Sequence, residues 1–156
     1  MRPGFVIALV ASAWLLCGRL AAVADVPQGA APDDARTRQL AERDRLDASS
    51  GDFRIEGKLS EARDCEIKAL GIEREIFGPN HDEVASRLES LASLEQQAGD
   101  FKAARRQLRA AGEMYVKLHG ENYYAVARLR RWSLQVDRLE KLSAEQFARY
   151  AESSRA

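Results

Sequence analysis

The side chains best suited to chemistry are few. Outside the N-terminal segment there is one cysteine, Cys65, and the chain has two histidines, His81 and His119. Cys65 shares the helical spacing of neighbouring apolar residues, which favours a buried, inert thiol over a nucleophile. No cysteine or carboxylate joins the histidines at a spacing typical of metal ligands. We therefore expect no metal site and no cofactor.

Recognisable catalytic patterns are also missing from the sequence. No Ser-His-Asp set can be argued from spacing, and there is no glycine-rich phosphate loop and no paired-carboxylate motif. Glutamate and arginine are abundant, but their alternation along a helix is typical of a solvated face. The sequence thus predicts no catalytic residue, and we expect a protein that is not an enzyme.

The elements that position these residues are helices. Apolar and small residues recur at steps of three and four, as in Leu59, Ala62 and Cys65. This period places them on one face of a helix and predicts an all-α fold without strands. The charged residues between them are expected to face water. In the helix that begins near Leu59 these are Glu61, Arg63, Asp64, Glu66, Lys68, Glu73, Arg74 and Glu75.

Turn and capping residues predict the helix ends. Helices are expected to end at Gly78, Gly99 and Gly120, since glycine readily adopts the backbone conformation of a helix C-cap. Two pairs have the spacing of a capping box, in which both side chains satisfy free amide groups at a helix start: Asn80 with Glu83, and Ser143 with Gln146.

The local signals for secondary structure are weaker in residues 33–56. Asp33 is expected to cap a helix that contains Leu40 and Leu46. Residues 48–56 stay undecided, because Gly51 disfavours a helix by about 1 kcal/mol relative to alanine.

An internal repeat relates residues 57–85 to residues 99–127 with an offset of 42. A fixed period of this size is typical of stacked helical arrays. Beyond residue 127, Leu129 and Trp132 fit Leu88 and Leu91 better at an offset of 41. The identical pairs are Gly57/Gly99, Ala62/Ala104, Arg63/Arg105, Ala69/Ala111, Gly78/Gly120, Asn80/Asn122, Val84/Val126 and Ala85/Ala127.

The repeated stretch resembles a tetratricopeptide repeat, and more narrowly the 42-residue variety of kinesin light chains and many bacterial proteins. The resemblance implies antiparallel helix pairs stacked into a short right-handed superhelix (α-solenoid), whose concave face holds a peptide or partner protein. We expect this domain over residues 33–156, with the best repeats at 57–98 and 99–140. The matching residues are Glu61-Ala62, Ala69-Leu70, Ile72, Gly78 to His81, Val84-Ala85, Leu88, Leu91-Ala92 and Gly99 to Phe101.

The resemblance also indicates candidate partner-binding residues. Kinesin-type repeats often carry paired asparagines after the first leucine of a Leu-x-x-Leu-Ala segment. Glu89 and Ser90 hold these places here, and Arg130 and Arg131 hold them in the next repeat. An asparagine clamp is therefore not expected. With Arg87, these arginines predict a charged groove that favours acidic segments, unless they are ordinary solvated charges.

The N-terminal residues 1–24 have the pattern of a secretory signal peptide. A positive start with Arg2 precedes the apolar run from Phe5 to Cys17, and Ala22-Val23-Ala24 is a small-residue cleavage pattern. The alternatives are an uncleaved membrane anchor and a lipoprotein acylated at Cys17. We expect cleavage, a flexible linker at 25–32 and a periplasmic or extracellular location.

Charge limits the class of partner. Cleavage removes Arg2 and Arg19 and no acid, which leaves 22 basic and 24 acidic residues. A nucleic-acid-binding domain would need a marked basic excess, so none is expected. The sequence predicts an exported adaptor that binds a protein or peptide. The alternative is a structural homo-oligomer formed by end-to-end stacking of short arrays.

Overall fold

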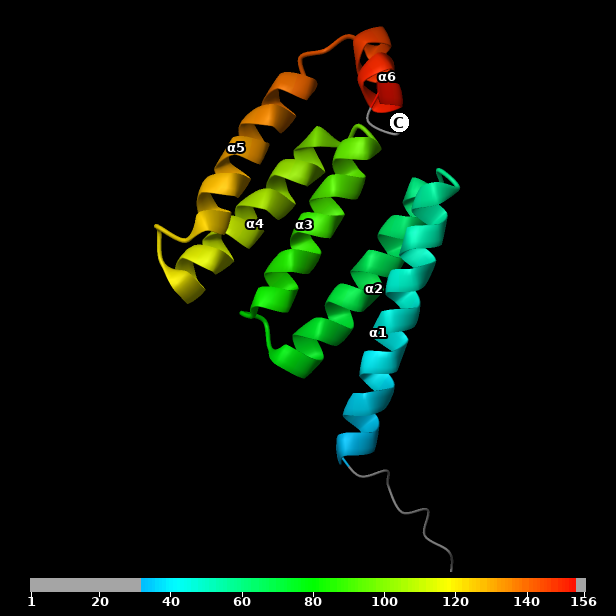
Figure 1. Cartoon of the computed structure of the whole chain (residues 1–156), viewed down its shortest axis with the longest axis vertical. Coiled ribbons are helices and arrows are strands. Elements are labelled where there is room, and N and C mark those ends of the chain that lie inside the picture. Colours follow the sequence, from blue (N-terminus) through cyan, green and yellow to red (C-terminus); the bar gives the residue numbers. More distant parts are fainter. Residues whose placement is uncertain (1–31, 154–156) are drawn as a thin grey trace, which may run out of the picture.

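The structure is a computed structural model that describes residues 32–153. This part of the chain contains six α-helices and no strand, which confirms the predicted all-α repeat fold. Figure 1 shows the first five helices side by side in chain order, with the short sixth helix across one end of the array. The helices are α1 (Pro32–Ile55), α2 (Leu59–Phe77), α3 (Asp82–Gln97), α4 (Phe101–His119), α5 (Tyr124–Leu139) and α6 (Ala144–Ser153).

The helices pair into hairpins and the hairpins stack. The closest pairs are α1 with α2 and α3 with α4, and α2 and α4 also contact the helix that follows each of them. The second helices of these two hairpins, α2 and α4, each have 19 residues. Each ends at a glycine with positive φ, 86° at Gly78 and 89° at Gly120, a conformation that other residues rarely adopt. The 42-residue offset therefore repeats a helix of fixed length and its turn.

Alanines allow the helices to pack closely. Ala62, Ala69, Ala104 and Ala111 are fully buried, and each lies on the face that its helix turns to the core. A repeated ion pair accompanies this packing. Arg63 on α2 pairs with Glu95 on α3 at 3.4 Å, and 42 residues later Arg105 on α4 pairs with Asp137 on α5 at 3.3 Å. The repeat thus has an arginine at both positions, Arg63 and Arg105, because each one forms a contact between successive hairpins.

The repeat register changes within α5. Ala85 is buried, whereas Ala127, its partner at an offset of 42, is exposed. Leu129 is buried in the same core as Leu88, as the offset of 41 predicted. The two offsets coexist because α5 begins 42 residues after α3, whereas its buried residues follow the offset of 41.

Two predicted helix starts are corrected by the structure. Asn80 does not cap α3, because this helix begins one residue later than predicted. His81 takes that role, and its Nδ1 accepts a hydrogen bond from the amide of Glu83 at 3.2 Å. The Asn80 side chain instead accepts a hydrogen bond from Lys117 at 3.1 Å. Asp33 is not a cap either, since α1 begins at Pro32.

The capping box at α6 is confirmed. The Ser143 amide donates to the Gln146 side chain at 2.9 Å, and the Gln146 amide donates to the Ser143 hydroxyl at 3.3 Å. The undecided segment 48–56 belongs almost wholly to α1, which continues to Ile55. Packing outweighs the cost of Gly51 here, because the neighbouring Ser50 is buried and donates a hydrogen bond to Glu66 on α2 at 2.8 Å.

The predicted signal peptide at 1–24 and most of the linker at 25–32 lie outside the described residues. Pro32, the last residue of that linker, is the first residue of α1. Within residues 32–153, no helix is both long enough and apolar enough to span a membrane.

Candidate binding groove

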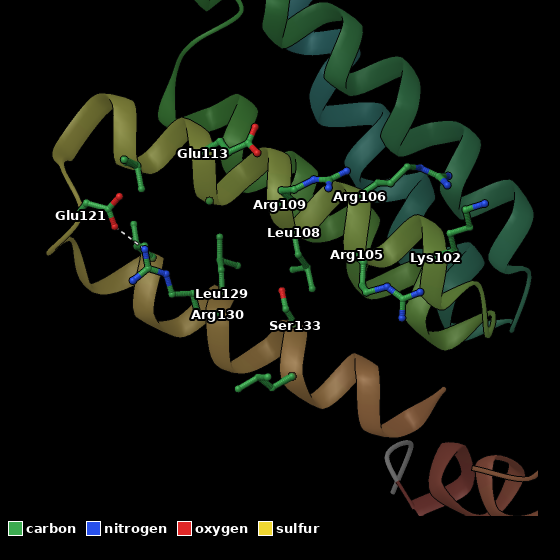
Figure 2. A pocket seen from close by; sticks show the side chains of 14 residues that line it. Lys102, Arg105, Arg106, Leu108, Arg109, Glu113, Glu121, Leu129, Arg130 and Ser133 are labelled. Carbon is green, nitrogen blue, oxygen red and sulfur yellow. Dashed lines mark hydrogen bonds and ion pairs between the residues drawn. The ribbon is translucent and has the colours of Figure 1, made fainter. Parts of the chain in front are cut away.

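A groove of about 970 Å³ lies between α4 and α5. Its floor is apolar, and Figure 2 shows Leu108 from α4 and Leu129 from α5 pointing into it. Val116 and Val126 extend the floor, and Leu134 on α5 lines it with 59% of its surface exposed. Burying such surface against an apolar partner would be favourable, because apolar area would leave water.

The shape of the floor follows from residue spacing on the two helices. Leu108, Gly112 and Val116 are four residues apart, so they lie on one face of α4. Gly112 has no side chain, and a Cβ placed there would still be 3.9 Å from the nearest atom of Leu129. The glycine therefore deepens the groove midway along α4.

Positive charges line the α4 side of the groove. Lys102, Arg106 and Arg109 are exposed, and their spacing of four and three residues sets them in a row along the helix. Within residues 32–153, none of the three forms an ion pair. Figure 2 shows them along α4, with Arg130 on α5 across the groove. We call Lys102, Arg106 and Arg109 the cationic row.

The other two arginines of the groove are paired, whereas Glu113 on α4, which also lines the groove, forms no ion pair within residues 32–153. Arg105 contacts Glu140, the residue that follows α5, and Asp137 on α5, and these partners raise its pKa. Arg130 pairs with Glu121 at 2.5 Å. Three unpaired cations therefore face the one unpaired carboxylate of Glu113, so the cationic row gives the groove an excess of positive charge.

The groove is open because α6 does not cover it. In chain order α6 is the counterpart of α4, but it has 10 residues and none of them is buried. Its Phe147 packs edge-on against Phe101 at the start of α4, with ring centroids 5.2 Å apart. Figure 1 accordingly shows α6 at the end of the array, and no residue of α6 lines the groove.

Arg87, a predicted binding residue, lies inside the protein. Only 10% of its side chain is exposed, and it pairs with Glu73 at 2.6 Å and with Glu66 at 2.8 Å, both on α2. Asp47 on α1 is its third partner. The prediction that Glu66 and Glu73 face water was wrong, since both are buried. Their charges are tolerated because the Arg87 guanidinium neutralises them.

The pKa of Arg87 reflects the same contacts. Burial lowers this pKa, but hydrogen bonds to Glu73, Asp47 and Glu66 outweigh burial and raise it above its usual value. Arg87 therefore stays charged and joins three helices. Its position gives it a structural role and leaves it outside the groove.

Glu89, a second predicted binding residue, is also buried. It accepts hydrogen bonds from Tyr115 on α4 at 3.0 Å and from Arg128 on α5 at 2.8 Å. Burial of Tyr115 raises the pKa of its hydroxyl, and the Glu89 charge raises it further. Glu89 thus fixes α5 against the α3–α4 hairpin.

The remaining predicted residues are divided between two surfaces. Ser90 is half-buried on α3, and Arg131 is exposed on α5. Neither lines the groove, whereas Arg130 does. The prediction missed the cationic row, although the run KAARRQLR at 102–109 shows its spacing. The missing information was that α6 leaves this face uncovered.

The cysteine and the two histidines lie in contacts that stabilise the fold. Cys65 is buried, His81 caps α3 and stacks on Phe77, and His119 lies 2.6 Å from Asp82. In the described part of the chain, no three side chains of the His, Cys, Asp and Glu types come together as a metal site.

A comparison with family models matches residues 51–116 to the model described as the tetratricopeptide repeat. The match runs from the last turn of α1 into α4 and includes the whole of α2 and α3. A comparison with curated proteins gives no match.

Proposed function

We propose that this chain, which carries tetratricopeptide repeats, is an exported protein–protein interaction module that binds a partner protein between α4 and α5. Repeats of this family support protein interaction in general. The proposal of a binding site rests on the open groove, which has an apolar floor and an excess of positive charge from the cationic row. These features are typical of a surface completed by another molecule.

A binding role accounts for the groove better than a catalytic one. The family is typically non-catalytic, and the groove lining of 14 residues includes no histidine and no cysteine. Its charged residues are spread along two helices and the turn between them. Such an arrangement recognises a surface and does not activate a reacting atom.

Capture of the partner from a cell-envelope extract tests the proposal. The bait is the chain without residues 1–24, and the test variant is Leu134→Glu, which places a charge at an exposed position of the groove. Ile67→Glu is the matched control, because Ile67 is a 45% exposed aliphatic residue on α2 outside the groove.

We expect wild type and Ile67→Glu to retain the same protein and Leu134→Glu to lose it. Circular dichroism should show equal helix content for all three baits. Equal retention by Leu134→Glu would contradict binding at this groove.

Export is supported by the pattern of residues 1–24, and the mature chain can be measured directly. We expect mass spectrometry of protein recovered from the envelope fraction to give an N-terminus at Asp25. An intact N-terminus in the membrane fraction would favour a retained anchor. A lipid mass on Cys17 would favour a lipoprotein.

A further inference from the structure

The open groove corresponds to a face that is covered one hairpin earlier. At the offset of 41, Arg130 on α5 corresponds to Glu89 on α3. Glu89 is buried and contacts Tyr115 on α4, whereas 66% of the Arg130 side chain is exposed. A helix, α4, therefore covers this face of α3, and no helix within residues 32–153 covers the same face of α5.

This correspondence indicates the shape of the occupant. The groove extends along α4 from Lys102 to Val116, that is, over most of a helix of 19 residues. Such a helix is about 28 Å long at 1.5 Å per residue. Two parallel ridges of side chains with an apolar floor between them suit a third helix that inserts its own apolar stripe.

The cationic row indicates the charge of the occupant. Lys102, Arg106 and Arg109 follow helical spacing, so a helix beside α4 could place three carboxylates opposite them at the same spacing. The chain as a whole has equal numbers of basic and acidic residues. The row is therefore a local feature of this groove and not the result of a basic protein.

A second copy of the chain fits the groove poorly. In a symmetric dimer through this face, two cationic rows would lie close together and repel each other. In head-to-tail stacking, the free face of α1 would have to fill the groove. The large apolar residues of α1 near its middle, Leu40 and Leu46, are half-buried, so they do not form an exposed stripe.

We infer that the groove between α4 and α5 binds an amphipathic helix of a partner protein that has an apolar stripe and an acidic flank beside the cationic row. The inference rests on the proposed function and specifies the partner of the same site.

The test uses three synthetic helical peptides of about 18 residues, a length similar to that of α4. The first has leucines at helical spacing and glutamates along one flank. The second has lysines in place of the glutamates, and the third keeps the glutamates but has alanines in place of the leucines. Binding to the mature chain is measured by fluorescence anisotropy at low and at moderate salt.

The protein variant is the triple charge reversal Lys102→Glu, Arg106→Glu and Arg109→Glu. Its control reverses three cations outside the groove, Lys68, Arg74 and Arg138, which are also exposed and free of ion pairs within residues 32–153. Both triple variants change the net charge equally, so the comparison isolates position.

We expect wild type and the control variant to bind the first peptide best and to lose affinity as salt rises. The groove variant should bind it at least about tenfold more weakly, because three surface pairs become repulsive. It should then prefer the lysine peptide. Equal binding of the first peptide by wild type and groove variant would overturn the inference, and so would equal binding of the first and third peptides.

The two proposals can fail separately. If Leu134→Glu abolishes partner capture but no peptide binds, the groove binds a protein of another kind and only the inference fails. If light scattering shows a concentration-dependent dimer that Leu134→Glu dissociates, the occupant is a second copy. If partner capture is unaffected by Leu134→Glu, the proposed function of the groove fails.

Discussion

Arg87 offers the sharpest test of how the array is held together. Replacing it by methionine keeps an unbranched side chain of similar length but removes the charge. Glu73 is 1% exposed and Glu66 is 6% exposed, so both carboxylates would lose their cation in a place that water barely reaches. Asp47 is 41% exposed in its side chain and can turn to water, so it contributes little to the loss.

Removal of one partner from a buried ion pair costs about 3–5 kcal/mol, chiefly because the other charge remains buried. Ser50 still donates a hydrogen bond to Glu66 in the variant, whereas no hydrogen-bond partner other than Arg87 is found for Glu73 in the described residues. Most of the cost should thus come from Glu73. We expect Arg87→Met to lower the free energy of unfolding by about 3–5 kcal/mol, much of what a domain of this size has.

The assay is urea unfolding of the mature chain at neutral pH, followed by circular dichroism. A double-mutant cycle with Glu73→Gln shows whether the mechanism is correct. Glu73→Gln should destabilise the wild type, where it weakens an ion pair. It should recover at least about 1 kcal/mol in the Arg87→Met background, where it removes an uncompensated charge.

Arg131→Met is the control, since Arg131 is exposed and unpaired within residues 32–153, and it should change stability by no more than about 0.5 kcal/mol. A loss below about 1 kcal/mol in Arg87→Met would refute the reasoning. So would a Glu73→Gln effect of the same sign and size in both backgrounds.

Three further predictions concern the helices, and thermal unfolding of the mature chain measures each. Gly71→Ala should stabilise the protein by up to about 1 kcal/mol, because no atom crowds the new methyl group in α2. Gly78→Ala should destabilise the protein by about 1–3 kcal/mol, because Gly78 has a positive φ. Equal effects of the two substitutions would contradict the turn at Gly78. His81→Ala should lower the free energy of unfolding by about 0.5–1 kcal/mol, because it removes the N-cap of α3. A larger decrease in Asn80→Ala would indicate that Asn80 caps α3, as the sequence predicted. Ala104→Arg should unfold the array, because Ala104 is fully buried, and a stable, folded variant would contradict this packing.

The sequence predicted the repeat well where local signals were strong. Helices α2 to α5 have apolar stripes at regular spacing, and a glycine follows each of α2, α3 and α4. The sequence failed where distant residues decide the outcome. Glu66 and Glu73 have the spacing of a solvated face, and only Arg87 on the next helix makes their burial possible. The helix across Gly51 likewise depends on packing against α2.

The candidate site was only partly predictable for the same reason. Arg130 was singled out and does line the groove, whereas Arg87 and Glu89 lie within internal contacts. The residue types do not distinguish a surface arginine from a buried one. The groove itself depends on the path of α6, which local spacing does not specify.

The lack of buried residues in α6 also affects where the array unfolds locally. A helix without buried side chains has little to oppose local unfolding, whereas α3 and α4 lie in the centre of the core. Hydrogen exchange of backbone amides should therefore be fastest in α6, slower in α5 and slowest in α3 and α4. The groove lies between the slow and the intermediate regions. A helix bound there should slow exchange in α5 while α6 continues to exchange freely.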